Sequence, residues 1–194
     1  MYYITSHFSA TYEEKQSKFI AHLIPYESYK ESLEHLKNQH PKARHFVTSY
    51  RYFNEFDQIV ENSSDDGEPK GTSGKPTLSV LQGSELINTA VIVVRYFGGT
   101  KLGTGGLVRA YSDAVNLVLK SAELFLYKKE KVEKIRFSYS DMGRVEYECL
   151  QHEITIVEKF FANEVCFTIQ AQEHILDAFY KRSEDWLQCM RSEK

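Results

Sequence analysis

The feature that most constrains this sequence is an apolar run that leads into a glycine-rich segment. Residues 88–97 read Asn-Thr-Ala-Val-Ile-Val-Val-Arg-Tyr-Phe, and this continuous apolar run predicts a strand buried on both faces. Five glycines follow within the nine residues 98–106, and a helical stripe of apolar residues then runs to about Ala122. Glycines between a buried strand and a helix favour anion binding by bare backbone N–H groups, although they also permit a tight turn with close packing. Because there are more glycines than a turn requires, we expect backbone contacts with a ligand at Gly98, Gly99, Gly103, Gly105 and Gly106.

The segment before this strand alternates between strand and helix patterns. Residues 2–25 predict two strands, residues 27–39 have a helical period that Pro41 ends, and residues 45–53 are rich in β-branched and aromatic residues. A polar, turn-rich break runs from Asn62 to Lys75, and a short helix is expected to begin near Pro76.

After Leu126 the pattern restarts on a smaller scale. It predicts strand 131–139, helix 141–151, strand 153–160, strand 164–171, helix 172–183 and a last strand near Trp186–Met190. This βαββαβ order is the ferredoxin-like arrangement. The sequence therefore predicts an α+β protein with two domains, residues 1–126 and 127–194.

Composition limits the classes of partner. The 194 residues carry a net charge of −3, so any nucleic-acid contact must come from a local patch and not from bulk charge. No stretch approaches the ~20 apolar residues that span a bilayer, which predicts no membrane partner. The start of the chain has no secretory pattern and no C-x-x-C pair occurs, so the expected location is cytoplasmic. Cys149 and His152 lie one helical turn apart, but this spacing is common by chance and a catalytic dyad is disfavoured.

A second charged loop, residues 64–76, contains three carboxylates within four residues, Asp65, Asp66 and Glu68. They could hold a hard cation, cap the helix near Pro76, or pair with Arg95, Lys101 or Arg109. No second carboxylate cluster completes a metal site, so an anchoring role is favoured and neither a metal nor a cofactor is expected. His45 could approach this loop, but a lone strand histidine is more often a packed, hydrogen-bonded residue.

The glycine-rich segment is locally cationic. Arg95, Lys101 and Arg109 are the only charged residues from 95 to 112, which gives a local charge of +3. Named nucleotide motifs fail here: a G-x-G-x-x-G pattern from Gly103 meets Val108, and a Walker pattern ending at Gly74-Lys75 meets Pro76.

The two loops resemble the signature of the IMPACT/YigZ family. The resemblance rests on residues 65–76, Asp-Asp-Gly-Glu-Pro-Lys-Gly-Thr-Ser-Gly-Lys-Pro, and on residues 94–111, from Val-Arg-Tyr-Phe-Gly-Gly to Leu-Val-Arg-Ala-Tyr. It spans residues 1–122, and the part after Leu126 resembles the small C-terminal domain of bacterial members. One departure is Phe46-Val47, where the family usually has an Asn-Cys pair.

The resemblance implies a fold for each domain and a role in translation. It implies an N-terminal domain like domain IV of elongation factor G and like a small-subunit ribosomal protein domain, and a C-terminal domain similar to domain V of that factor. Eukaryotic relatives regulate translation initiation by interfering with activation of a kinase of initiation factor 2α, through segments that this chain lacks.

The two charged loops favour one of two main functions. The favoured one is a non-catalytic protein that binds RNA or the ribosome and regulates translation, with Tyr96 and Phe97 available for base stacking. The alternative is an enzyme on a phosphorylated or nucleotide ligand, in which Asp65, Asp66 and Glu68 converge with His45 and Lys101 on one pocket. A protein-docking module with an exposed apolar patch is a third interpretation.

Overall fold

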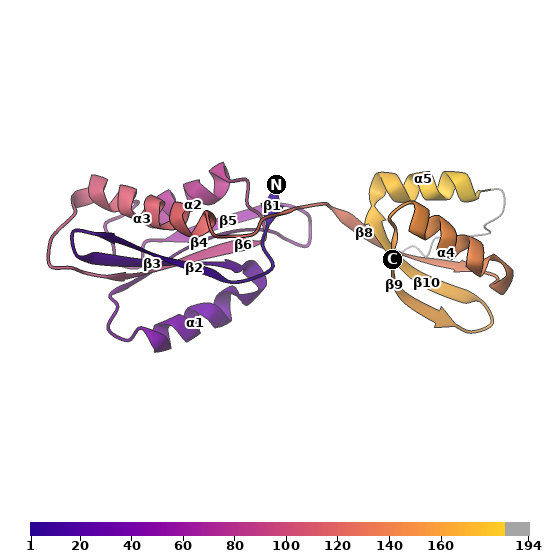
Figure 1. Ribbon diagram of the computed structural model, residues 1–194, viewed down its shortest axis with the longest axis horizontal. Coiled ribbons are helices and arrows are strands. Elements are labelled where there is room, and N and C mark those ends of the chain that lie inside the picture. Colours follow the sequence, from indigo (N-terminus) through magenta and orange to yellow (C-terminus); the bar gives the residue numbers. More distant parts are fainter. Residues whose placement is uncertain (185–194) are drawn as a thin grey trace. The chain divides into compact units, whose positions relative to one another are not determined.

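The computed structural model describes residues 1–184. The chain divides into two compact units, Met1–Tyr127 and Lys128–Lys194. No helix in the described range has both the length and the apolar character needed to cross a membrane. The chain is α+β, with separate sheets in the two units (Figure 1).

The first unit is built on a five-stranded antiparallel sheet in the order β2-β3-β6-β4-β5. Its central strand is β6, the continuous apolar run, which is buried along almost its whole length. The strands are β2 (Phe8–Glu14), β3 (Ser17–Pro25), β6 (Thr89–Tyr96), β4 (His45–Phe53) and β5 (Ile59–Ser64).

Helices cover both faces of this sheet (Figure 1). Helices α2 (Gly74–Gly83) and α3 (Gly103–Leu119) pack on one face, where Phe19, Val93 and Tyr111 belong to the larger core. Helix α1 (Tyr29–Gln39), which follows the 3₁₀ turn η1 (Tyr26–Ser28), packs on the other face. The loops 65–73 and 97–102 lead into α2 and α3, so the sheet and both helices fix the position of the candidate site.

Several strands were not expected from the sequence. Residues 2–25 form three strands and not two, because β1 (Tyr2–Tyr3) pairs separately with β7 (Phe125–Leu126). Strand β5 contains residues 62–64, which the sequence assigned to the polar break. It is an edge strand bound only to β4, so its backbone bonds and not its side-chain pattern define it.

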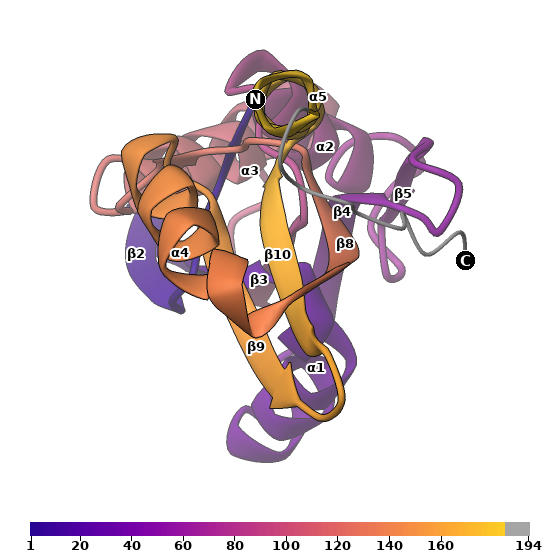
Figure 2. The same ribbon diagram turned by 90° about the vertical axis from the view of Figure 1, so that its right-hand side faces the viewer.

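The second unit has a three-stranded antiparallel sheet with β10 between β8 and β9 (Figure 2). This order fits the predicted ferredoxin-like arrangement, in which two parallel strands flank an antiparallel one. The strand predicted at Trp186–Met190 lies outside the described residues. The elements are β8 (Glu130–Phe137), η2 (Tyr139–Asp141), α4 (Met142–Gln151), β9 (Thr155–Phe161), β10 (Val165–Gln172) and α5 (Glu173–Ser183).

Candidate functional site

Asp65 binds the N-terminus of α2. Its Oδ1 accepts hydrogen bonds from Ser73 N at 3.1 Å, Ser73 Oγ at 2.7 Å and Gly74 N at 2.8 Å, and its Oδ2 accepts one from Gly71 N at 2.7 Å. Burial alone would raise the pKa of Asp65, but these donors outweigh it and hold the pKa below its ordinary value. Of the roles open to this carboxylate, the structure selects the helix cap.

Asp66 fastens the same loop to β4. Its Oδ2 accepts a hydrogen bond from Phe46 N at 2.6 Å, and its carbonyl oxygen lies 2.8 Å from Nδ1 of His45. Gly67 follows with a φ of +84°, a left-handed conformation that favours glycine. His45 is therefore packed and hydrogen-bonded, as the sequence favoured.

Glu68 turns into the protein and meets Arg95. The two side chains form an ion pair in which only 4% and 6% of their respective surfaces are exposed. Tyr111 donates a hydrogen bond from its hydroxyl to Glu68 at 2.8 Å, and Nε2 of His45 lies 3.9 Å from the same carboxylate. Burial, and then the Glu68 charge, raise the pKa of Tyr111. This network joins loop 65–73, β6 and α3 in the core.

The charge that the glycine-rich segment presents at the surface is therefore smaller than the +3 counted from the sequence. Arg95 is buried in its ion pair with Glu68, with its guanidinium carbon 5.3 Å from the centre of the Phe19 ring, and offers no charge to a ligand. Lys101 and Arg109 are exposed. The sequence predicted Tyr111 only as part of the apolar stripe of α3. A buried tyrosine hydroxyl needs a hydrogen-bond partner, and this requirement is the signal that could have identified Tyr111 as part of the site.

At most of these positions, local packing or backbone conformation explains why the residue is glycine. A Cβ at Gly98 would lie 2.0 Å from the backbone carbon of Gln16, because this glycine packs against the β2–β3 turn. Gly99 and Gly103 have φ values of +88° and +73°, and a Cβ at Gly106 would lie 3.0 Å from Cβ of Leu102. Gly105 has none of these constraints: its Cβ position is open space and its backbone is exposed.

The exposed end of α3 is the part of the loop that a ligand can reach. The N-cap position is Leu102, which has no side-chain oxygen to accept from the first N–H groups of the helix. Arg109 folds back so that its Nε donates to Gly105 O at 3.3 Å, which holds its guanidinium beside the first turn. Phe97 is exposed, whereas Tyr96 is half-buried with its hydroxyl 2.9 Å from Nδ1 of His40.

Between α2 and α3 the surface is hollowed. The hollow has a volume of about 410 Å³, and Lys75 is the cation among the residues that line it. Lys75 was not among the residues expected to bind, because the sequence placed it only at the end of a loop. The residues that line the hollow are Gly71, Lys75, Pro76, Ser79, Val80, Val108 and Ser112.

The carboxylates do not converge. Asp65 faces α2, Asp66 faces β4 and Glu68 faces Arg95, so the shared pocket required by the enzyme alternative is not formed by these groups. Within residues 1–184, no group of three or more His, Cys, Asp or Glu side chains is arranged to hold a metal ion. Cys149 is buried, and burial raises its pKa to about 11, which opposes the thiolate that a catalytic dyad needs.

Comparison with known proteins places the chain. Residues 15–119 match the Impact N-terminal domain, and a Haemophilus influenzae protein named IMPACT family member is 35% identical over 182 residues, with 91% of this chain and 88% of the relative covered. The chain belongs to the IMPACT family. Both signature loops lie within the matched range, and residues 135–182 match a second domain, DUF1949, of unknown function.

Other members agree with this assignment. The family member YigZ of Escherichia coli is 44% identical over 111 residues, with 56% of this chain and 54% of the relative covered. The Protein IMPACT homolog of Schizosaccharomyces pombe is 29% identical over 111 residues, which cover 55% of this chain and 39% of the relative. A crystal structure of a hypothetical protein superposes with a TM-score of 0.69 and 29% identity, over 100% of this chain and 97% of the other.

Proposed function

We propose that this IMPACT family member is a non-catalytic protein that binds RNA or the ribosome and regulates translation. The observation on which this depends is the exposed N-terminus of α3, where Lys101 and Arg109 flank an uncapped helix end and Gly105 leaves the backbone open. Backbone N–H groups at a helix N-terminus, with cations beside them, bind phosphate oxygens. The family resemblance, which implies a role in translation, supports the same proposal.

The geometry favours a few well-placed phosphate contacts over a broad basic surface. Because Arg95 is neutralised by Glu68, Lys101 and Arg109 are the exposed cations of the glycine-rich segment, and Lys75 lines the hollow between α2 and α3. A ligand with two or three phosphates in a fixed arrangement, such as a folded RNA backbone, matches these cations better than an extended polyanion does. At about −0.9 per neutralised phosphate, the value for duplex nucleic acid, two or three contacts should give a total slope of log K against log salt of only about −2 to −3.

The first test measures binding of the full chain to ribosomes by co-sedimentation and to ribosomal RNA fragments by fluorescence anisotropy. Lys101→Ala and Arg109→Ala should each weaken binding by about 1 kcal/mol, or roughly fivefold, and reduce the salt slope by about one. Lys37→Ala, which removes an exposed cation from α1, is the matched control. Binding that is independent of salt, or equal in all three variants, would refute the proposal.

Gly105 provides a second test that separates binding from folding. Gly105→Ala adds a methyl group into open space within a helix, so stability should stay equal or rise by up to about 1 kcal/mol. The same methyl group should obstruct the approach of a phosphate to the backbone and weaken binding. A variant that binds as well as the original chain would show that the ligand does not contact this turn.

A further inference from the structure

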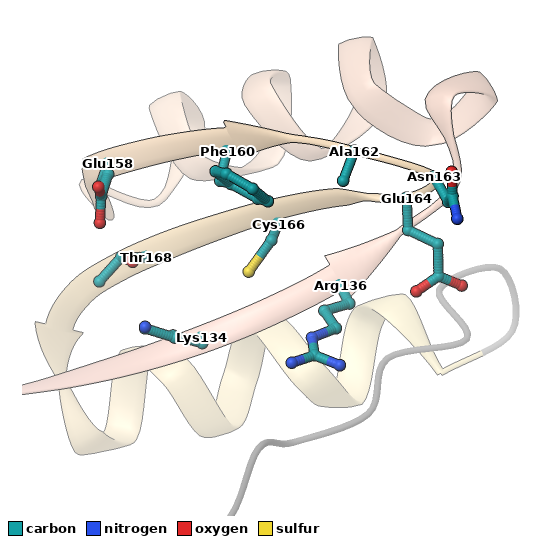
Figure 3. A pocket seen from close by; sticks show the side chains of 9 residues that line it. All are labelled: Lys134, Arg136, Glu158, Phe160, Ala162, Asn163, Glu164, Cys166 and Thr168. Atoms are coloured by element: carbon teal, nitrogen blue, oxygen red, sulfur yellow. The ribbon is translucent and has the colours of Figure 1, made fainter.

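Among residues 128–184, the sheet of the second unit has a hollowed face opposite its helices. Along β10, Val165, Phe167 and Ile169 are buried in the core with α4 and α5, whereas Cys166 and Thr168 point to the other face and are only half-buried. This other face is hollowed, with a volume of about 680 Å³, and side chains from all three strands line it (Figure 3). Those used below are Lys134, Arg136, Glu158, Phe160, Cys166 and Thr168.

The strand register arranges these side chains in two rows. Cys166 lies opposite Arg136 on β8 and opposite Phe160 on β9, and Thr168 lies in the same way between Lys134 and Glu158. Each row spans two strand spacings, or roughly 9.5 Å between the outer backbones. A nucleotide can extend its base and its phosphate over a distance of this order, so one row can contact both ends.

The chemistry of the rows fits a nucleotide. Phe160 is 63% exposed on a sheet, and its ring provides a flat surface for base stacking. Within residues 1–184, the side chain of neither Lys134 nor Arg136 has a hydrogen-bond or ion-pair partner, so both cations are available to phosphates. Glu158 can accept hydrogen bonds from the amino groups of bases.

We propose that this face binds single-stranded RNA, with a base stacked on Phe160 and the phosphates held by Arg136 and Lys134. The proposal extends the proposed function by a second RNA surface. The two surfaces have no residue in common, so each can fail alone.

The balance of charges selects single strands over other occupants. Glu158 and Glu164 also line the hollow, and two cations beside two carboxylates would not attract the dense charge of a duplex. A protein partner would favour an apolar centre depleted of charge, whereas three of the four side chains that flank the central Cys166 and Thr168 on this face are charged, namely Arg136, Lys134 and Glu158. An exposed aromatic with a few cations is the arrangement that unpaired bases recognise.

The test uses the full chain with a short fluorescent single-stranded RNA, and the same sequence annealed to its complement. Phe160→Ala should weaken single-strand binding roughly 5- to 150-fold, the range for loss of one stacked base. Phe161→Ala is the matched control, because it removes the neighbouring exposed aromatic that does not line the hollow. Arg136→Ala should reduce the salt slope by about 0.7, whereas Lys181→Ala, on α5, should leave it unchanged.

A crosslinking readout locates the contact. RNA that contains 4-thiouridine should crosslink to the β9–β10 peptides, and Phe160→Ala should abolish this crosslink while Lys101→Ala and Arg109→Ala preserve it. Equal single-strand binding by the chain and its Phe160→Ala and Arg136→Ala variants would overturn the proposal. So would duplex binding as tight as single-strand binding, or loss of a protein partner and not of RNA in these variants.

Discussion

Acid should destabilise the first unit through His22. This histidine of β3 is 7% exposed on the α1 side of the sheet, and its Nδ1 lies 2.9 Å from Nε2 of His7. Its Nε2 is buried without a hydrogen-bond partner among residues 1–184. Burial, and then the nearby His7 and His40, lower the pKa of His22 from 6.5 to about 4. Because these groups are also histidines, none of them compensates a positive charge on His22.

The direction and size of this pH effect on the free energy of unfolding follow from the linkage between proton binding and folding. Between pH 6.5 and about pH 4 the unfolded chain binds a proton at His22 that the folded chain does not, so the stabilisation is complete above pH 6.5 and is lost as the pH falls. The slope is about 1.4 kcal/mol per pH unit, and the whole effect is about 3 kcal/mol. The pKa of His7 is also lowered, by burial and by His35, and acts in the same direction.

Hydrogen exchange of the full chain, followed by mass spectrometry across this pH range, measures the opening free energy of β3 and β6 separately from the second unit. His22→Gln removes the titrating ring. The slope of the opening free energy of β3 against pH should therefore fall by the contribution of one proton, about 1.4 kcal/mol per pH unit. His174→Gln, which changes an exposed histidine of α5, is the control. If the original chain and His22→Gln lose stability in parallel between pH 6.5 and pH 4, the reasoning about His22 is wrong.

Three further predictions concern the loops. Glu68→Ala leaves Arg95 buried without its partner and should cost about 3–5 kcal/mol in urea unfolding, whereas Glu68→Gln, which keeps an acceptor for Tyr111, should cost less; equal losses would contradict the ion-pair argument. Asp65→Ala removes the cap of α2 and should cost about 0.5–2 kcal/mol, detectable as faster exchange in residues 71–77; unchanged exchange there would argue against capping. Gly98→Ala should cost about 1–3 kcal/mol because its methyl group meets the backbone of Gln16, while Gly105→Ala serves as its control.

The regular elements could be predicted because their side-chain periods are local. The central strand, the helix that follows the glycines, and the alternation in the second unit all appear in windows of about ten residues. Strand β5 was missed because backbone pairing with β4 defines it, and β1 and β7 because each has only two residues. A pairing between residues more than a hundred positions apart leaves no local pattern.

The site was harder to predict because charges close in sequence diverge in space. Asp65, Asp66 and Glu68 lie within four residues, yet the turn directs them to three different elements. The charge of Arg95 is neutralised by Glu68, 27 residues away, and only the fold brings the two together. The histidines around His22 are likewise far apart in the sequence, and their clustering was not predicted.

The two proposed surfaces make a joint prediction that neither makes alone. Variants of Lys101 or Arg109 change one unit, and variants of Phe160 or Arg136 change the other. If separate RNA molecules occupy the two surfaces, the losses measured on one probe should be absent on the other. If a single RNA with a folded part and a free strand occupies both, the second contact becomes intramolecular and tightens binding through its effective concentration. In that case Phe160→Ala should weaken binding of the composite RNA by a factor that approaches, but does not exceed, its effect on the single strand alone, and Lys101→Ala should weaken binding of the same RNA. Weaker binding of the composite RNA in only one of these two variants would show that the two surfaces act on different molecules.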